Sequence, residues 1–393
     1  MFLFFEGSEK KAQIVVKDKQ LSLLDDITDD FWTAFVQCCN AQILSSIRND
    51  DCKAFLLSES SLFVWHDRLL ILTCGNTRLV HSVEFFIQHI GMDKIKQVIY
   101  QRKNEYFSHA QPSSFGDDIK LLGQYVKGKA YRFGELDSHH NYIFHQDNSF
   151  QADKLDKTYE LLAYQISDRA SEKLTTVGLT AQEIRQFLQL DKFFADFTLD
   201  DFVFDPFGYS VNAIKGKEYL TIHVTPQANS SYVSIEANIN LIKIAGDFLA
   251  ILAPKSFDLL SFNDFDFVNL TNEFIPKNYV SKSLVSEHLS NNYFVCFANY
   301  ILPQQKFMQA TVLDLAGENH ALWFFHKRKI SRLLGSKFKV KKVLFSGKSE
   351  FTTVDVVATK GHGNMLLKDG LIMVTERDEF AYHGMPWIFS KHF

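Results

Sequence analysis

The chain repeats one order of elements, two strands followed by a helix, in its first and second halves. Residues 54–57 and 62–73 are rich in strand-forming apolar side chains, with a turn at residues 66–68. Residues 79–90 return to the helical period and end before Gly91. The same order recurs loosely as strand 218–225, strand 231–236 and helix 240–252. This repeat indicates a structural duplication.

Three further segments have apolar residues at helical spacing and are predicted to be helices. They are residues 28–48, 156–166 and 180–190. The last opens with a capping box formed by Thr180 and Glu183. Strand pairs that alternate with helices favour an α+β sandwich over a parallel βαβ fold.

The composition is that of a globular protein with room for two or three domains. The chain has 393 residues, of which 46% are hydrophobic and 22% are charged. A net charge of −4 gives no electrostatic footprint for nucleic acid, and the basic run at 337–342 is predicted to be a solvated strand edge. We therefore expect no nucleic-acid partner.

The cysteine pattern and the amino-terminal residues indicate the compartment in which the protein is found. Five cysteines form neither an even disulfide framework nor a C-x-x-C pair, so we expect no metal site and a reducing environment. Residues 1–5 are apolar but lack a basic n-region, and no later run reaches the length of a membrane span. The sequence predicts a cytoplasmic protein without a membrane partner.

Two short motifs lie near the first strand pair. Residues 57–64 read Leu-Ser-Glu-Ser-Ser-Leu-Phe-Val, and residues 72–77 read Leu-Thr-Cys-Gly-Asn-Thr. Together they resemble the self-cleaving site of the S-adenosylmethionine decarboxylase family. Four more segments extend the resemblance to the eukaryotic-type enzymes over residues 1–302: they are 4–10, 204–212, 221–226 and 231–236.

The resemblance implies a fold and a reaction. The fold is a four-layer α/β/β/α sandwich with internal duplication. The chain is cut between Glu59 and Ser60 into fragments 1–59 and 60–393, which stay associated, and Ser60 becomes a pyruvoyl cofactor. Its carbonyl forms a Schiff base with S-adenosyl-L-methionine and is the electron sink for loss of carbon dioxide. This carboxy-lyase reaction supplies spermidine and spermine synthesis.

The resemblance also assigns catalytic roles. His223 is the base for self-processing, Ser210 is a donor to the tetrahedral intermediate, and Cys74 is the proton donor after decarboxylation. Glu6 and Glu9 belong to the same catalytic set. Taken singly, Cys74 and His223 would fit ordinary core positions equally well. The order of six matching segments favours the catalytic interpretation.

Substrate-binding residues follow from the same match. Phe5 and Phe204 correspond to the aromatic pair that stacks on adenine, and Leu57 belongs to the expected substrate site. Gln227 stands where the family usually has a glutamate that accepts the ribose hydroxyls. An amide oxygen can still accept these hydrogen bonds, but it brings no charge.

An acidic group resembles the buried cluster through which animal members respond to putrescine. It comprises Asp156, Thr158, Glu160 and Glu236. Two residues of the family's cluster are replaced in this chain. Leu72 stands where a lysine is expected, and Gln13 stands where a glutamate is expected. An alternative interpretation places residues 156–160 at a helix start, where acidic residues complement the helix dipole without any ligand. Putrescine is therefore one candidate ligand of this group, and a group without any ligand is the alternative.

Residues 303–393 carry a second resemblance. Residues 363–383 resemble the amino-terminal β-region of spermidine synthase, but no glycine-rich nucleotide loop or Rossmann domain follows. We interpret the segment as a truncated synthase piece without transferase activity, or as a small β-meander that docks or mediates association. A homodimer is one such assembly.

Two other functions compete with an active decarboxylase. One is a weakly active regulatory paralogue that pairs with an active enzyme, and the other is a scaffold whose tail recruits a spermidine synthase. The presence of Ser60, Cys74, Ser210 and His223 argues against the first, because a regulatory paralogue has no need of a self-processing set.

Overall fold

The computed structural model describes residues 9–17, 21–105, 108, 111–226, 231–303, 340–348, 353–359, 363–368 and 371–376. The chain divides into two compact units, unit 1 at Met1–Gln304 and unit 2 at Gln305–Phe393. Among the described residues, no helix has both the length and the apolar character needed to cross a membrane.

The first half of unit 1 forms one eight-stranded sheet with three helices. The sheet order is β2-β3-β4-β5-β1-β6-β8-β7. The elements in chain order are β1 (Lys10–Val16), α1 (Asp29–Cys38), β2 (Ile43–Arg48), β3 (Cys52–Leu57), β4 (Ser60–Trp65), β5 (Arg68–Thr73), α2 (Leu79–Ile90), β6 (Ile95–Lys103), α3 (Phe115–Leu122), β7 (Gly128–Gly134) and β8 (His140–Gln146).

The second half forms another eight-stranded sheet, with the order β10-β11-β12-β13-β9-β14-β16-β15. Its elements are β9 (Thr158–Tyr164), α4 (Asp168–Leu174), α5 (Ala181–Leu188), α6 (Leu190–Phe193), β10 (Thr198–Val203), β11 (Tyr209–Lys215), β12 (Glu218–Thr225), β13 (Tyr232–Ala237), α7 (Ile242–Leu252), β14 (Ser256–Phe262), α8 (Phe267–Phe274), β15 (Val280–His288) and β16 (Phe294–Ile301).

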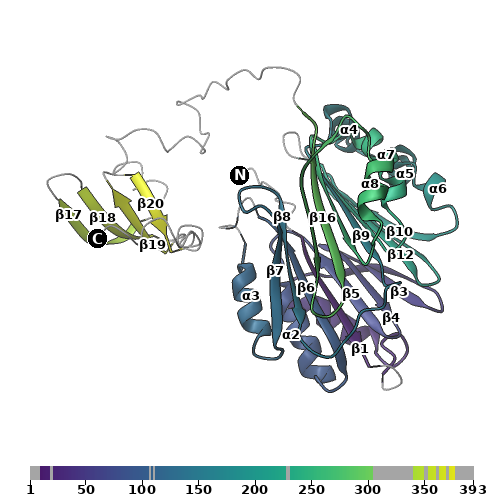
Figure 1. Cartoon of the computed structure of the whole chain (residues 1–393), viewed down its shortest axis with the longest axis horizontal. Coiled ribbons are helices and arrows are strands. Elements are labelled where there is room, and N and C mark those ends of the chain that lie inside the picture. The colour runs from purple at the N-terminus through teal and green to yellow at the C-terminus, as the bar shows by residue number, and fades with distance from the viewer. Residues whose placement is uncertain are drawn as a thin grey trace. The chain divides into compact units, whose positions relative to one another are not determined.

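The two halves have the same topology, which confirms the predicted duplication. Strand β4 of the first sheet occupies the place of β12 in the second, and β1 occupies the place of β9. Figure 1 shows the two sheets lying face to face, with α2 and α3 outside the first sheet and α4, α5, α7 and α8 outside the second. Neighbouring strands pair antiparallel. The architecture is the predicted four-layer α/β/β/α sandwich.

Alternation along each strand sorts side chains between the two faces of its sheet. In β12, Leu220, Ile222 and Val224 pack into the core beneath the second-half helices, so Thr221 and His223 face the first sheet. Apolar clusters fill the space between the sheets at two places, one around Phe63 and Trp65 and another around Phe262 and Phe297. Buried polar residues, among them Ser60, Ser210 and His223, lie on the same inner faces.

Two helix predictions were wrong in extent or in type. The helix predicted over 28–48 ends at Cys38, and Asn40 adopts a φ of 65°, after which Ile43–Arg48 forms an edge strand with alternating exposure. The helix predicted over 156–166 is strand β9, because Tyr159, Leu161 and Ala163 alternate into the helix-side core. Glu160 therefore points between the sheets and does not begin a helix.

Other local predictions were confirmed. The helix predicted at 79–90 is α2 and ends at Gly91, whose φ is 88°. Thr180 caps α5, and the predicted capping box with Glu183 is present. Both depend on short-range interactions that the sequence displays directly.

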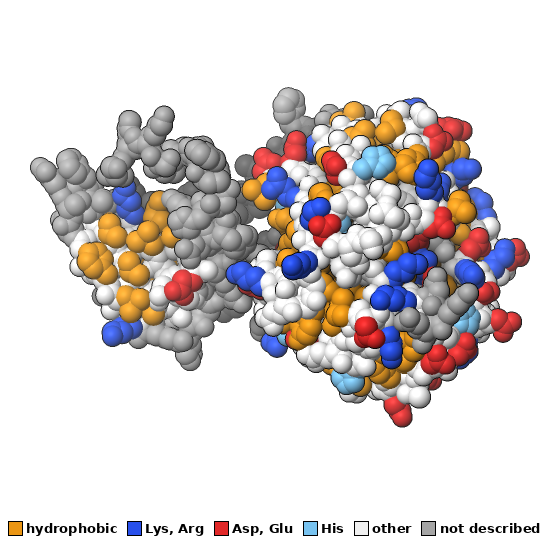
Figure 2. Space-filling view, turned by 60° about the horizontal axis from the view of Figure 1, so that its bottom comes forward, with side chains coloured by type: hydrophobic (Ala, Val, Ile, Leu, Met, Phe, Trp, Pro, Cys, Tyr) orange, Lys and Arg blue, Asp and Glu red, His pale blue; other side chains and the backbone are white. Residues whose placement is uncertain are grey.

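Unit 2 is a four-stranded antiparallel sheet in the order β17-β18-β19-β20. The strands are β17 (Val340–Lys348), β18 (Thr353–Thr359), β19 (Asn364–Lys368) and β20 (Leu371–Thr375). Val357, Met365 and Leu367 are buried, whereas Val343, Leu344 and Phe345 on the edge strand are exposed. Figure 2 shows hydrophobic side chains gathered on the surface of unit 2.

Candidate active site

The peptide bond between Glu59 and Ser60 lies at the end of a tight hairpin. Strands β3 and β4 pair with Leu57 opposite Ser60, so only Ser58 and Glu59 form the turn. Ser60 has a φ of 143°, a value that L-residues rarely adopt. Strand alternation alone would point Ser60 to the same side as Leu62, which packs in the helix-side core. Instead, the Ser60 hydroxyl reaches the second sheet.

His223 lies between hydroxyl groups from both sheets. Its Nε2 atom is 2.8 Å from the Ser60 Oγ atom, and its Nδ1 atom is 2.8 Å from the Ser210 Oγ atom. All three residues are buried. Burial lowers the pKa of His223 to about 3, because the interior disfavours the charged imidazolium. The ring is therefore neutral near neutral pH and one of its nitrogens is free to accept a proton.

Cys74 holds the carbonyl group of Glu59. The backbone N–H of Cys74 donates to the Glu59 carbonyl oxygen at 2.9 Å, and the thiol donates to the same oxygen at 3.2 Å. Burial and the carboxylates of Glu59 and Glu9 raise the pKa of the Cys74 thiol. The thiol therefore keeps its proton and remains a donor.

Glu9 and Lys10 bring ionisable groups near the same hairpin. Burial raises the pKa of Glu9 to about 7, against the lowering effect of a hydrogen bond from Ser234. Burial lowers the pKa of Lys10 to about 8. The Lys10 ammonium donates to the Gly75 carbonyl at 2.8 Å, which ties β1 to the segment that follows Cys74.

A buried cation, Lys11, lies between two members of the predicted acidic group. Its Nζ atom is 2.5 Å from Glu160 and 3.0 Å from Glu236. Gln101 donates to both Glu160 oxygens, and Tyr219 donates to Glu236 at 2.7 Å. Although burial lowers the pKa of Lys11, the two carboxylates outweigh this effect and the pKa is raised. Burial raises the pKa of Glu236 to about 7.

Lys11 supplies a cation beside Leu72, the residue that replaces the lysine expected from the family resemblance. The two residues are directly opposite each other on β1 and β5. The remaining space is a cavity of about 10 Å³, lined by Lys11, Leu72, Gln101, Glu160 and other residues. A cavity of this size is comparable to one water molecule and leaves no room for a diamine while Lys11 is in place.

The other two members of the acidic group, Asp156 and Thr158, have partners other than Lys11. Asp156 accepts from Arg68 at 2.6 Å and from the Tyr293 hydroxyl at 2.8 Å. The Thr158 side chain hydrogen-bonds to Tyr219. The three carboxylates thus form two charge centres, Glu160 and Glu236 around Lys11 and Asp156 beside Arg68. Thr158 is joined to the first centre through Tyr219.

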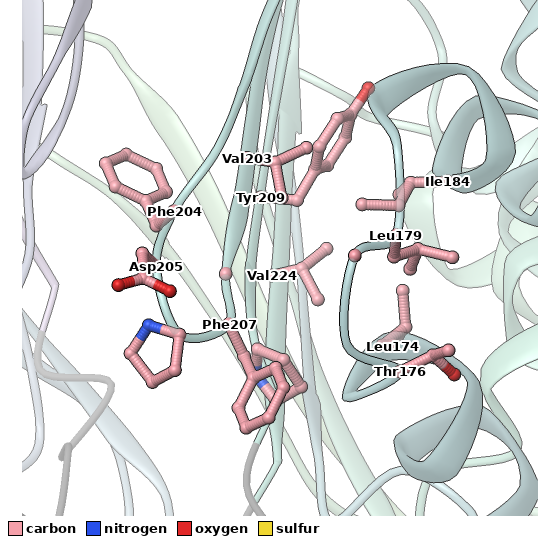
Figure 3. A pocket seen from close by; sticks show the side chains of 14 residues that line it. Leu174, Thr176, Leu179, Ile184, Val203, Phe204, Asp205, Phe207, Tyr209 and Val224 are labelled. Atoms are coloured by element: carbon pink, nitrogen blue, oxygen red, sulfur yellow. The ribbon is translucent and has the colours of Figure 1, made fainter.

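Phe204 lies on the loop between β10 and β11 and is half-buried. This loop lines a cavity of about 190 Å³ on the helix side of the second sheet, together with Leu179, Ile184 and Val224. In Figure 3 the Phe204 ring points away from Leu179 and Ile184. Because Val224 and His223 face opposite sides of β12, this cavity and the Ser60–His223 pair lie on opposite faces of the sheet.

The remaining predicted residues are placed differently or lie outside the described part. The Leu57 side chain is fully buried in the core, so only its main chain could contact a ligand. Phe5, Glu6 and Gln227 lie outside the described residues. Within the described ranges, no group of three or more His, Cys, Asp or Glu side chains is arranged to hold a metal ion.

Sequence reasoning missed four buried polar residues of the site. They are Lys11, Ser61, Asn212 and Thr221. For Lys11 a signal existed, because it lies in a strand whose residues 12 and 14–16 are apolar, and a lysine buried there needs a partner. The other three lie within the matching segments, but their contacts join strands that are about 150 residues apart in sequence.

Comparisons with known proteins identify the family. The family model described as adenosylmethionine decarboxylase matches residues 3–301, most of the chain. The chain belongs to the adenosylmethionine decarboxylase family. A second model, described as the spermidine synthase tetramerisation domain, matches residues 322–376. The two predicted resemblances are therefore confirmed, and the family is one of carboxy-lyase enzymes.

Relatives from three organisms match most of this family region. An S-adenosylmethionine decarboxylase proenzyme from Trypanosoma cruzi is 30% identical over 327 residues, which cover 75% of this chain and 88% of the relative. The Leishmania donovani proenzyme is 31% identical, covering 66% and 73% respectively. The solved Trypanosoma brucei AdoMetDC-delta26 monomer is 23% identical with a TM-score of 0.47, covering 62% of this chain and 99% of that structure.

Proposed function

We propose that the chain is a self-processing, pyruvoyl-dependent decarboxylase of S-adenosyl-L-methionine, with the decarboxylase in residues 1–302 and a separate tail in 303–393. One observation carries the proposal. The Ser60 Oγ atom lies 2.8 Å from His223 Nε2 while Cys74 donates two hydrogen bonds to the adjacent Glu59 carbonyl. A nucleophile, a base and a polarised carbonyl therefore meet at one peptide bond.

Self-processing begins with an acyl shift. The Ser60 oxygen attacks the Glu59 carbonyl carbon as His223 takes the hydroxyl proton. The backbone N–H and the thiol of Cys74 stabilise the negative oxygen of the tetrahedral intermediate. The C–N bond then breaks, the nitrogen takes the proton from His223, and an ester joins Glu59 to the Ser60 side chain.

The second step releases the two fragments. A base removes the Cα proton of residue 60, the Cβ–O bond breaks, and Glu59 leaves as a carboxylate. The resulting dehydroalanine tautomerises to an imine, and water hydrolyses it to a ketone with loss of ammonia. His223, which is neutral and lies against residue 60, is the group suited to take this proton.

Backbone strain at Ser60 favours this chemistry. A φ of 143° at a non-glycine residue costs on the order of 1–3 kcal/mol. Cutting the chain at this bond frees residue 60 from the hairpin and removes that cost. The hairpin thus stores free energy at the bond that breaks.

The pyruvoyl carbonyl, once formed, supplies the electron sink for decarboxylation. Cys74 lies beside residue 60 and keeps its thiol proton, so it is placed to protonate the substrate α-carbon after carbon dioxide leaves. Phe204 offers a half-buried aromatic face for adenine. The product is the aminopropyl donor for polyamine synthesis.

Intact mass under denaturing conditions tests the assignment. We expect two fragments, residues 1–59 and 60–393, the second with a ketone in place of its amino group. Ser60→Ala should give a single uncut chain, because no hydroxyl remains for the acyl shift. An uncut wild-type chain that still releases carbon dioxide would overturn the proposal, and an efficiently cut chain without decarboxylase activity would favour the regulatory paralogue.

The tail is proposed to associate with a second copy of the chain. Its family match is to a domain described by tetramerisation, and its edge strand presents Val343, Leu344 and Phe345 to solvent. An exposed apolar edge strand is a template for pairing with another chain. Sedimentation of the full chain should show a dimer or larger assembly. Leu344→Glu should reduce its mass, whereas Val268→Glu, at an exposed position on α8, should not.

A further inference from the structure

A chain of hydrogen bonds begins at His223 Nε2, the ring nitrogen that does not contact Ser210. The Thr221 hydroxyl is 2.9 Å from His223 Nε2 and 3.0 Å from the Ser61 hydroxyl. Ser61 in turn donates to the Asn212 side-chain oxygen at 2.6 Å. Ser61, Asn212 and Thr221 are buried between the two sheets, where water does not compete for these bonds.

The direction of this chain follows from counting protons. A hydroxyl has one proton to donate, and Ser61 uses its proton on Asn212. Ser61 can then only accept from Thr221, so the Thr221 proton points toward Ser61. Thr221 consequently turns a lone pair, not a proton, toward His223 Nε2.

We propose that Asn212, Ser61 and Thr221 form a positioning relay that keeps His223 Nε2 open to the Ser60 proton. This inference rests on the proposed self-processing function and deepens it. The Ser61 oxygen also lies 3.4 Å from Nε2, but its proton is held by Asn212. With the Thr221 proton held by Ser61, the Ser60 hydroxyl is then the donor to Nε2 among these three hydroxyls. Once Nε2 is protonated, the Thr221 lone pair accepts the new N–H.

The opposite direction would block the base. If the Thr221 proton pointed at Nε2, it would occupy the lone pair that has to receive the Ser60 proton. The structure turns the Asn212 oxygen toward Ser61 and leaves the Asn212 side-chain nitrogen without a hydrogen-bond partner among the described residues. The acceptor at the end of the relay thus sets the direction of every bond in it.

Five variants of the full chain test the relay through the rate of self-cleavage, measured by intact mass against time. Thr221→Val removes the acceptor and should slow cleavage about 10- to 100-fold, the loss expected for a hydrogen bond to a charge that forms during reaction. Thr221→Ser keeps the hydroxyl and should recover most of that loss. Thr271→Val makes the same change at a buried site on α8 and is the matched control.

The decisive variant is Ser61→Ala, which frees the Thr221 proton to turn toward Nε2. Cleavage should slow, and adding Thr221→Val to Ser61→Ala should not slow it further, because the competing donor is then gone. Additive losses, or cleavage in both single variants at the wild-type rate, would overturn the relay. Failure of the wild-type chain to cleave at Glu59–Ser60 would instead overturn the proposed function. Thermal unfolding of each variant separates these results from loss of fold.

Discussion

Replacement of Lys11 by alanine should convert a self-contained charge cluster into one that needs an added amine. The side chain neutralises Glu160 and Glu236, and neither carboxylate has another charged partner within the described hydrogen-bond network. Removing one partner from a buried ion pair costs about 3–5 kcal/mol, because the remaining charges stay buried. This is a large share of the ~5–15 kcal/mol that stabilises a typical domain.

The loss should depend on pH. The Lys11 charge lowers the pKa of Glu236, which burial has raised to about 7, so its removal raises that pKa further. A carboxyl group whose pKa is raised on folding contributes stability at low pH and loses it as pH rises through the folded pKa. The variant should therefore differ least from wild type near pH 6 and most near pH 8.

Thermal and urea unfolding at these two pH values measure the effect. The substitution removes the Cγ, Cδ, Cε and Nζ atoms, which together match propylamine. Millimolar propylamine or putrescine should raise the stability and the cleavage rate of the variant but not those of wild type. Lys192→Ala, which removes an exposed ion pair with Asp247, is the matched control and should change stability by about 0–1 kcal/mol.

Two results would refute the reasoning about Lys11. One is a variant as stable as wild type at pH 8, which would mean that the carboxylates do not depend on this cation. The other is a wild-type chain whose decarboxylation rises with putrescine, since the cavity beside Lys11 holds no more than one water molecule. Either result would reopen the acidic group as a diamine site.

Three further predictions concern the reacting centre and the tail. His223→Ala should slow cleavage about 10²- to 10⁴-fold and accumulate an ester that hydroxylamine cuts, and wild-type formation of the ketone would show that another base acts. Cys74→Ala should keep most self-cleavage, because the backbone N–H still binds the Glu59 carbonyl, but should impair release of labelled carbon dioxide or yield wrongly protonated product. A protein of residues 1–393 given decarboxylated S-adenosylmethionine and putrescine should form no spermidine above the blank, since the synthase-like match at residues 322–376 is to a domain described by tetramerisation and not by nucleotide binding.

The sequence by itself determined the local elements and the order of the motifs. Helix α2 and the capping box of α5 were predicted because caps and helical periodicity involve neighbours within a few residues. The family resemblance and the duplicated strand–strand–helix order were also readable along the chain. The proposed cleavage site, Glu59–Ser60, was predicted in this way.

Short segments with mixed signals were decided by tertiary packing. Residues 158–164 form a strand because three alternate side chains enter the core under the second-half helices, while Glu160 finds Lys11 on the facing sheet. Residues 43–48 form an edge strand paired to β3. Both segments are short, and their apolar residues fit helical spacing as well as strand alternation. The neighbouring strands and the core that they pack against therefore decide which structure forms.

The tertiary structure alone decided which polar side chains meet. Ser60 and His223 are 163 residues apart, and Lys11 and Glu236 are 225 apart, yet each pair lies within hydrogen-bond distance across the space between the sheets. No local pattern carries that information, because strand alternation assigns a face to each residue but not the residue that faces it. The register of one sheet against the other supplied Lys11 as the internal cation and joined Asn212, Ser61 and Thr221 to the histidine.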